Sequence, residues 1–414
     1  MKPSFTHTDL LESLGYGYFE LDLRGRLIYG NNQFLNALGY TKEELLGKHF
    51  RQYVDRDQVS LFFNIFAMIY KTGLVEKRLP LDFVHKDGSL RTSEGSYALI
   101  RDESNNPIGY RGILLDVTET KQKETILIQA KQKAERELEI AREIQSSFLV
   151  ENYPQPEGWE IATRIRPARQ VSGDFYDVFP ISANKRIAFL IADVCDKGVG
   201  AALYMAIFRS LLRAYADQNY TMRWVGTPDY LQEERPSGIF RRDALLASGA
   251  PSIKNAIELT NKYIATHHSD SNMFATVFFG LLDPSNGMLL YINAGHESPI
   301  LISNGTVKAR LDPTGPAVGM LPDMEFKLEQ TALNPGDSLI LYTDGVTDAL
   351  NAENEQFTEE RLITTALKPS ASAQTYLMDI VSAVDNHIAG REQFDDITLL
   401  AVHRKAENEF PKAH

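Results

Sequence analysis

The fold is decided by Ile187-Ala188-Phe189-Leu190-Ile191-Ala192, an apolar run that leads directly into Asp193-Val194-Cys195-Asp196-Lys197-Gly198. A short continuous apolar run bounded by polar turn residues is typical of a strand that is buried on both faces. A carboxylate at the end of such a strand is held rigidly while its backbone stays in the core. The stretch therefore predicts a core strand with a chemically useful aspartate, Asp193, at its end.

Three further segments of the same kind occur in the second half of the chain, and we call the four together the acidic islands. The others are Ser172-Gly173-Asp174-Phe175-Tyr176-Asp177, Tyr342-Thr343-Asp344-Gly345-Val346-Thr347-Asp348 and Phe394-Asp395-Asp396-Ile397-Thr398. Apolar runs adjoin two of them, at 338–342 and 397–402. A lone Asp-Gly or Asp-Asp is usually a solvated turn. If the strands are neighbours, however, the carboxylates meet, and like charges so close are tolerated only around a cation. Oxygen ligands suit Mg²⁺ or Mn²⁺ rather than zinc.

The order and local sequence of the islands resemble the metal-dependent protein phosphatases of the protein phosphatase 2C type. The closer resemblance is to the SpoIIE/RsbU-like branch, whose members remove phosphate from serine or threonine of regulatory proteins. The resemblance runs from about Ala141 to His403. It also includes Ala141-Arg142-Glu143-Ile144-Gln145, Met273-Phe274-Ala275-Thr276-Val277-Phe278-Phe279-Gly280 and Asn293-Ala294-Gly295-His296. It implies an αββα sandwich in which two central sheets carry the metal site between them.

The resemblance also implies roles for individual residues. Asp193 would bridge two metal ions, Mn²⁺ or Mg²⁺, with the carbonyl of Val194 as a further oxygen ligand. Asp174 would place a water on one ion, while Asp344 and Asp395 would hold the other. The implied catalytic residues are Asp193 and Asp174, since two cations can both activate a water and neutralise the phosphoryl oxygens.

Several nearby residues are expected to play supporting parts or none. We expect Asp177, Asp348 and Asp396 to support the metal-ligating residues or to cap nearby backbone segments, rather than to bind metal themselves. Cys195 lacks the Cys-x₅-Arg loop of a thiol phosphatase and is expected to be a buried, inert thiol. His296 is either a structural histidine, which we favour, or a proton donor. Asp196 stands where the branch usually has glycine or another small residue.

The first third of the chain resembles a PAS domain, predicted at residues 8–117. Short strands at 18–22 and 27–30 precede a helix at 31–40, and three longer strands follow at 77–85, 90–100 and 108–116. The resemblance rests on Gly39-Tyr40-Thr41-Lys42-Glu43-Glu44-Leu45-Leu46-Gly47 and Asp116-Val117-Thr118-Glu119. No cysteine is present for a flavin bond, and His49 and His85 are more typical of solvated histidines than of haem ligands. The ligand is therefore unknown, and a ligand-free module stays open.

Residues 118–150 contain no Pro or Gly and are predicted to form one helical linker. A heptad seam, broken at Glu137, runs through Leu127, Ala130, Ala134, Ala141, Ile144 and Phe148. A single solvated helix is one interpretation. We favour a short parallel coiled coil in a homodimer formed through the PAS domain and the linker.

Composition limits the function classes. The 414 residues suffice for two or three domains, and the net charge of −12 argues against nucleic-acid and anionic-membrane partners. No apolar stretch reaches the ~18 residues of a membrane span. The chain begins without a signal-peptide pattern, and its one cysteine fits a reducing cytoplasm.

The predicted protein is a cytoplasmic, PAS-controlled serine/threonine phosphatase whose catalytic domain spans residues 151–405. Its implied substrate is a phosphorylated anti-sigma-factor antagonist. One alternative is a PAS-linked two-metal nucleotidyl cyclase, against which no Gly-Gly-Asp/Glu-Glu-Phe turn occurs. Another is a pseudophosphatase scaffold, which Asp196 keeps open although all four ligands are present. The stretch 219–250 is predicted to be an insertion, by default a disordered surface loop and otherwise a lid or docking flap.

Overall fold

The computed structural model describes residues 7–149, 152–181, 186–221, 250–368, 370 and 372–406. The chain divides into two compact units, Met1–Glu135 and Arg136–His414. The larger part of the predicted insertion, residues 222–249, lies outside the described residues. Among the helices of the described ranges, none is long and apolar enough to cross a bilayer.

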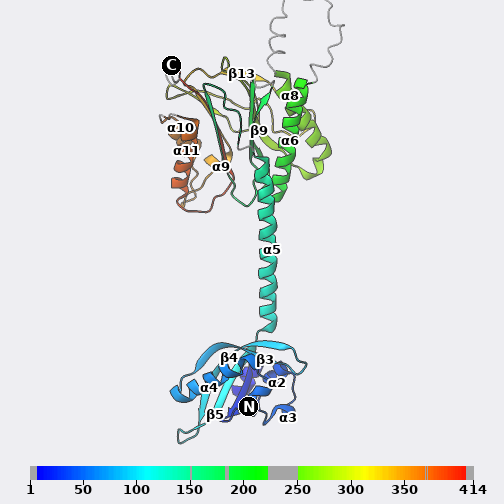
Figure 1. Cartoon of the computed structure of the whole chain (residues 1–414), viewed down its shortest axis with the longest axis vertical. Coiled ribbons are helices and arrows are strands. Elements are labelled where there is room, and N and C mark those ends of the chain that lie inside the picture. Colours follow the sequence, from blue (N-terminus) through cyan, green and yellow to red (C-terminus); the bar gives the residue numbers. More distant parts are fainter. Residues whose placement is uncertain are drawn as a thin grey trace, which may run out of the picture. The chain divides into compact units, whose positions relative to one another are not determined.

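The first unit is a five-stranded antiparallel sheet in the order β2-β1-β5-β4-β3 (Figure 1). Its strands are β1 (Gly17–Asp22), β2 (Leu27–Gly30), β3 (Glu76–Val84), β4 (Leu90–Arg101) and β5 (Pro107–Asp116). Its helices are α1 (His7–Ser13), α2 (Asn32–Leu38), α3 (Lys42–Leu45), η1 (Phe50–Gln52), η2 (Arg56–Gln58) and α4 (Val59–Thr72). Two strands, then helices, then a three-strand meander is the order expected of a PAS domain, so that expectation is confirmed.

Local signals in the sequence explain where these helices begin and end. The Asn31 side chain accepts hydrogen bonds from the main-chain N–H groups of Phe34 and Tyr18, which starts α2 and ties it to β1. Gly39 ends α2 with a left-handed φ of 71°. Thr41 and Glu44 form a reciprocal capping box at α3. These caps fix the ends of the helices, and buried side chains such as Phe34 and Leu38 pack α2 against the sheet.

The second unit contains two five-stranded antiparallel sheets. One has the order β13-β10-β9-β8-β7, and the other has the order β12-β11-β14-β15-β6. The first comprises β7 (Phe175–Ile181), β8 (Arg186–Val194), β9 (Ala275–Asp283), β10 (Met288–Ala294) and β13 (Glu329–Ala332). The second comprises β6 (Trp159–Arg166), β11 (Ile300–Ser303), β12 (Thr306–Arg310), β14 (Ser338–Tyr342) and β15 (Ile397–Arg404). The apolar run that decides the fold is the core of β8, as predicted.

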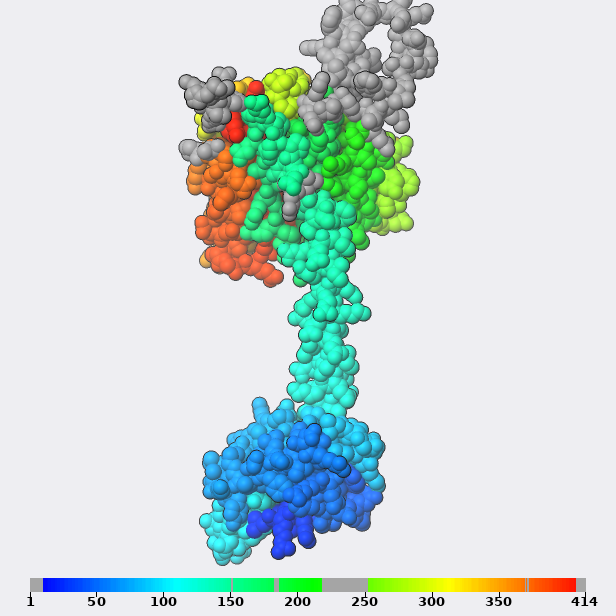
Figure 2. Space-filling view, viewed as in Figure 1, coloured from blue at the N-terminus to red at the C-terminus, as the bar shows by residue number. Residues whose placement is uncertain are grey.

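Helices cover the outer faces of the two sheets. They are α6 (Val199–Thr221) and α8 (Ala250–His267) on one side, and α10 (Glu359–Ala366) and α11 (Ala373–Ile388) on the other (Figures 1 and 2). The short elements η5 (Ser269–Ser271) and α9 (Asp344–Thr347) complete the unit. Between the sheets lies an apolar layer to which Trp159, Phe189, Leu341 and Leu400 belong. Burial of each such side chain contributes about 1.5–3 kcal/mol. The predicted αββα sandwich is confirmed.

One helix, α5 (Thr118–Phe148), follows the first sheet and forms the predicted linker helix. The boundary between the two units falls within it. Seam positions are exposed in the single chain: Leu127 is 70% exposed and Ile144 is 54% exposed. Gln145 is the only side chain of α5 that is buried.

Candidate active site

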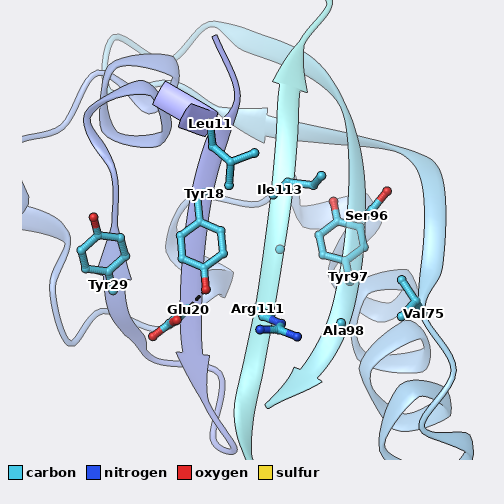
Figure 3. A pocket seen from close by; sticks show the side chains of 11 residues that line it. Leu11, Tyr18, Glu20, Tyr29, Val75, Ser96, Tyr97, Ala98, Arg111 and Ile113 are labelled. Atoms are coloured by element: carbon cyan, nitrogen blue, oxygen red, sulfur yellow. Dashed lines mark hydrogen bonds between the residues drawn. The ribbon is translucent and has the colours of Figure 1, made fainter. Parts of the chain in front are cut away.

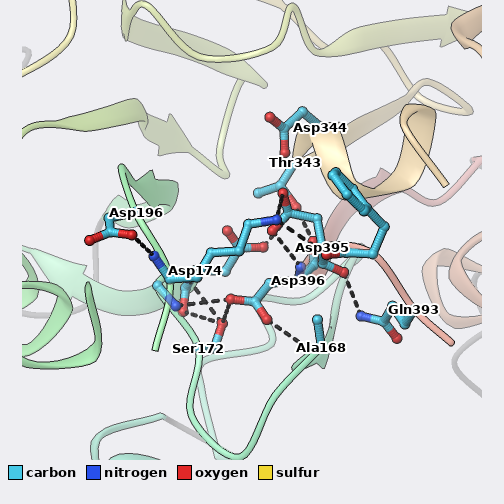
Figure 4. A network of polar contacts seen from close by, with 12 residues as sticks. Ala168, Ser172, Asp174, Asp196, Thr343, Asp344, Gln393, Asp395 and Asp396 are labelled. Atoms are coloured by element: carbon cyan, nitrogen blue, oxygen red, sulfur yellow. Dashed lines mark hydrogen bonds and ion pairs between the residues drawn. The ribbon is translucent and has the colours of Figure 1, made fainter. Parts of the chain in front are cut away.

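The four acidic islands lie at neighbouring strand ends of the second unit. Asp174 comes directly before β7, and Asp193 lies at the end of the adjacent strand β8. Asp344 opens α9 directly after β14, and Asp395 precedes the adjacent strand β15. Each sheet therefore supplies two aspartates through its paired strands, and the packing of the two sheets brings segments about 200 residues apart to one place (Figure 4).

Asp396 joins the islands of the two sheets. Its carboxylate accepts hydrogen bonds from the N–H of Ala168 (2.7 Å), the hydroxyl of Ser172 (2.8 Å) and the N–H of Gly173 (2.9 Å). All these donors lie on the segment that carries Asp174, whereas Asp396 belongs to the fourth island (Figure 4). Asp396 is thus a buried anchor for the first island, in line with its expected supporting role.

Thr343 makes a second connection between the sheets. Its hydroxyl donates to Oδ2 of Asp174 at 2.7 Å and accepts from the N–H of Thr398 at 3.0 Å. The hydroxyl therefore fixes one oxygen of Asp174 and the start of β15 together. The sequence analysis did not single out Thr343, although it stands within a quoted island.

Two glycines of the islands stand at close backbone approaches, and one of them, Gly345, has no room for a side chain. A Cβ added at Gly345 would lie 1.9 Å from the carbonyl oxygen of Asp396, so the third and fourth islands touch through their main chains. A Cβ at Gly173 would lie 3.0 Å from the carbonyl oxygen of Val194. The Val194 carbonyl, implied as a metal ligand, therefore faces the first island.

The aspartates raise one another's pKa values. Burial raises the pKa of Asp174 well above its usual range, and the charges of Asp193 and Asp396 raise it further. Burial, followed by the charge of Asp344, raises the pKa of Asp193 to about 7. The pKa of Asp344 is raised by burial and then by the charge of Asp395. Asp174, Asp193 and Asp344 thus stand in one electrostatic environment that disfavours their negative charge, and the charge of Asp395 contributes to it.

Lys197 supplies the cation of this environment. Its ammonium lies 2.7 Å from Oδ2 of Asp395, donates to the carbonyl of Phe394 at 3.2 Å, and stands 4.4 Å from the centre of the Phe394 ring. The charge of Lys197 also lowers the pKa of Asp344, against the larger effects that raise it. This contact joins the second and fourth islands, and no local sequence signal points to it.

The donor set fits hard divalent cations in chemistry, because buried carboxylates that repel one another are stabilised by an added positive charge. Among the residues the structure describes, no three His, Cys, Asp or Glu side chains are arranged so that they would hold a metal ion as they stand. Asp395 instead faces Lys197. A metal ion held by Asp395 would have to displace the ammonium of Lys197 from this carboxylate.

The remaining acidic residues of the islands have structural roles. Asp177 is fully buried on β7 and pairs with Arg209 (3.1 Å) and Arg213 (3.0 Å) of α6. Asp348 ends α9 and accepts from the side chain of Gln356. Asp196 adopts a left-handed φ of 72°. Glycine is favoured at such a φ and aspartate is tolerated, which explains the residue usual in the resembling branch.

Cys195 and His296 take no visible part in the site. Cys195 is half-buried rather than fully buried, and its sulfur accepts from the N–H of Phe274. Burial raises the pKa of this thiol, so it stays protonated and a poor nucleophile. His296 is buried, bonds through Nδ1 to the hydroxyl of Thr276 at 2.9 Å, and has its pKa lowered to about 3 by burial. This favours the structural interpretation of His296.

Gln145 connects the linker helix to the first island. Its side-chain N–H donates to the carbonyl of Ser172 at 2.7 Å, and its side-chain oxygen accepts from the N–H of Ser172 at 2.9 Å. Ser172 in turn bonds Asp396 and lies two residues before Asp174. The quoted segment Ala141–Gln145 thus touches the candidate site through Gln145.

Known protein families match both parts of the chain. The family described as Stage II sporulation protein E (SpoIIE) matches residues 183–405, and the PAS domain family matches residues 15–119. Protein IcfG of Synechocystis sp. is 44% identical over 269 residues, which is 65% of this chain and 41% of that protein. The match thus spans well under half the length of IcfG.

Two further similarities concern phosphatases. The phosphoserine phosphatase RsbU of Bacillus subtilis is 28% identical over 278 residues, which is 66% of this chain and 72% of RsbU. The solved SiaA-PP2C domain of Pseudomonas aeruginosa superposes with a TM-score of 0.50 at 20% identity, covering 66% of this chain and 98% of that domain. The latter is a similarity of fold.

Proposed function

The chain belongs to the SpoIIE family and carries a PAS domain, and from this premise we propose that it is a Mn²⁺- or Mg²⁺-dependent phosphoprotein serine/threonine phosphatase under PAS control. The observation that carries the proposal is the meeting of Asp174, Asp193, Asp344 and Asp395 from two sheets in one electrostatic environment. The division proposed is a PAS sensor at 8–117, a linker at 118–150 and a phosphatase domain at 151–405.

Asp174, Asp193, Asp344, Asp395 and the carbonyl of Val194 would hold two divalent cations. When bound, the cations supply an activated water and neutralise charge on the phosphoryl oxygens. The protein's own part is positioning. Asp396 holds the segment that carries Asp174, and Thr343 holds one carboxylate oxygen of Asp174. In this proposal no side chain serves as the nucleophile.

The proposed substrate is a phosphoserine or phosphothreonine of a regulatory protein in the cytoplasm, of the anti-sigma-factor-antagonist kind. The similarity to RsbU, a phosphoserine phosphatase, supports this class. Control by the PAS domain is supported by Gln145, since the helix that follows the PAS sheet ends in direct contact with the segment that carries Asp174. A homodimer through the PAS domain and linker would cover the exposed apolar seam of α5.

A non-catalytic scaffold is the second candidate, and one observation favours it: Lys197 already pairs with Asp395. If this ion pair persisted, the second cation would be excluded. The cyclase alternative has no comparable support, because residues 183–405 match the SpoIIE family.

The proposal is tested by incubating the full chain with a panel of serine-phosphorylated antagonist proteins, with Mn²⁺ or with EDTA, and following loss of phosphate by mass spectrometry. We expect at least one substrate to lose phosphate only with Mn²⁺, and Asp193→Asn to be inactive. A scaffold would bind a panel member without dephosphorylating it at any Mn²⁺ concentration, also when Lys197→Met removes the competing ammonium.

A further inference from the structure

A cavity of about 590 Å³ lies against the PAS sheet (Figure 3). Its wall includes Tyr18 and Glu20 of β1, Tyr29 of β2, and Arg111 and Ile113 of β5. Successive side chains of a strand point to opposite faces of a sheet. On β1, the core residues Phe19 and Leu21 alternate with Tyr18 and Glu20, so the cavity opens on the face away from α4.

The opposite face of the sheet is filled by aromatic side chains. Phe62 and Phe66 of α4 have ring centres 4.8 Å apart, and the ring of Phe62 lies 4.9 Å from that of Phe50. Each of these rings is at most 5% exposed. Space for a small molecule is therefore present on the outer face, and its volume falls in the usual range of ligand sites, about 300–1,000 Å³.

The charged residues of the cavity are arranged unusually. Glu20 and Arg111 occupy directly opposed positions on β1 and β5, where opposite charges normally attract one another. Glu20 instead accepts a hydrogen bond of 2.5 Å from the hydroxyl of Tyr18. Within the described ranges, the guanidinium of Arg111 has neither an ion pair nor a hydrogen bond, although its charge is close enough to lower the pKa of Tyr18 against the larger effects that raise it. The guanidinium is thus available on the cavity wall while the carboxylate is held in place.

The Tyr18 hydroxyl maintains its hydrogen bond to Glu20 over the physiological pH range. Burial, with the hydrogen bond to Glu20 next, raises the pKa of Tyr18 to about 12, so the hydroxyl stays protonated and keeps donating to Glu20. One carboxylate oxygen of Glu20 is then occupied and the other can accept from a ligand. The rings of Tyr18 and Tyr29, with centres 6.0 Å apart, offer aromatic surface beside it.

We propose that this outer cavity binds a small aromatic carboxylate that also carries a hydroxyl or amino donor. The guanidinium of Arg111 would take the carboxylate through two parallel hydrogen bonds, a geometry that suits arginine. The tyrosine rings and Ile113 would contact the aromatic ring of the ligand. Glu20 would accept from the donor at the other end. Binding of this ligand does not depend on the proposed phosphatase function. Only its role as the signal that regulates the phosphatase rests on that proposed function.

Isothermal titration calorimetry of the full chain tests the proposal, with 4-hydroxyphenylacetate, 4-hydroxybenzoate and 4-aminobenzoate as probes. Phenylacetate lacks the donor and tyramine lacks the carboxylate, so they serve as matched controls. We expect at least one of the three probes to bind, its matched controls to bind about tenfold or more weakly, and Arg111→Gln to weaken the probe by a similar factor. Arg24→Gln, in the exposed β1–β2 turn outside the cavity, should leave affinity unchanged.

Glu20→Gln should reduce the preference for the hydroxylated or amino probe over phenylacetate. Thermal unfolding of each variant checks that the PAS fold is intact. The proposal is overturned if none of the three probes binds, or if Arg111→Gln binds them as well as the parent does. It is equally overturned if sedimentation shows that Ile113→Glu dissociates a dimer, because the face would then be an interface between copies. Phosphate release plays no part in the readout, so failure here is separate from failure of the phosphatase proposal.

Discussion

The aspartates of the candidate site are held in an environment that disfavours their own negative charge. Asp174 is 2% exposed and Asp193 stands beside it, and the pKa of each is raised by burial and by neighbouring carboxylates. The cost of holding these charges together is relieved by any cation that enters. We therefore expect the stability of the protein and the proposed metal binding to be linked through these residues.

The metal-free protein should lose stability as the pH rises from about 4 to about 7. The pKa of Asp193 is raised from 3.8 to about 7 in the folded state, so in this window the folded form holds a proton that the unfolded form has released. The slope from one such group is up to about 1.4 kcal/mol per pH unit, and it flattens above the folded pKa. Thermal unfolding in EDTA at several pH values measures it.

Asp193→Asn is the matched variant for this measurement. Its free energy of unfolding should fall less steeply with pH, because the amide does not titrate. Added Mn²⁺ should stabilise the parent protein most above pH 7, where the carboxylate is charged. Equal slopes for parent and variant would show that Asp193 is not the titrating group.

Replacement of Cys195 with alanine should leave phosphatase activity within about twofold. Burial raises the pKa of the thiol, with Asp193 and Asp196 contributing, so little thiolate forms near neutral pH. The check is the rate of phosphate release, together with the rate after treatment with a thiol-alkylating reagent. A Cys195→Ala protein that is folded but inactive would indicate that the thiol acts as a covalent nucleophile.

At the scale of elements, the connection between α5 and the first island would carry the proposed control by the PAS domain. We expect Gln145→Ala to weaken Mn²⁺ binding by roughly tenfold or more, because two buried hydrogen bonds to Ser172 are lost and the segment carrying Asp174 loosens. Calorimetric Mn²⁺ titration measures the effect. Ser146→Ala, which removes only a bond within the helix, is the control and should bind as the parent does.

The coiled-coil proposal concerns the same helix. One residue inserted after Lys133 rotates everything beyond it by about 100°, whereas seven residues preserve the heptad. The one-residue insertion should change basal activity and weaken self-association, and the seven-residue insertion should change both far less. Parent-like behaviour of both proteins, with a monomer in sedimentation, would rule out coupling through paired helices.

Most elements could be predicted from local pattern. The apolar run before Asp193 predicted β8, and Gly39 predicted the end of α2. The Pro- and Gly-free stretch from Thr118 predicted α5. Contacts between distant elements could not be predicted in this way. Lys197 meets Asp395 across nearly 200 residues, because the pairing of side chains depends on how the two sheets pack. The hydrogen bonds by which Asp396 anchors the first island depend on the same packing, so its supporting role could be expected but its partners could not.

On the scale of the whole molecule, a PAS domain and an αββα sandwich of the SpoIIE family occur in one chain with a net charge of −12. Part of that charge is concentrated at the meeting edge of the two sheets of the sandwich, where Lys197 is the cation paired with Asp395. The central claim is that this edge binds divalent cations and hydrolyses a phosphoserine ester. Everything proposed about regulation depends on that chemistry.

The most direct test is phosphate release from a serine-phosphorylated antagonist protein as a function of Mn²⁺ concentration. The proteins compared are the parent, Asp193→Asn and Asp283→Asn, whose aspartate ends β9 and pairs with Arg186. We predict saturable, EDTA-sensitive turnover for the parent and for Asp283→Asn, and a loss of about 10³-fold or more for Asp193→Asn. Turnover that survives EDTA, or an Asp193→Asn protein as active as the parent, would contradict the claim.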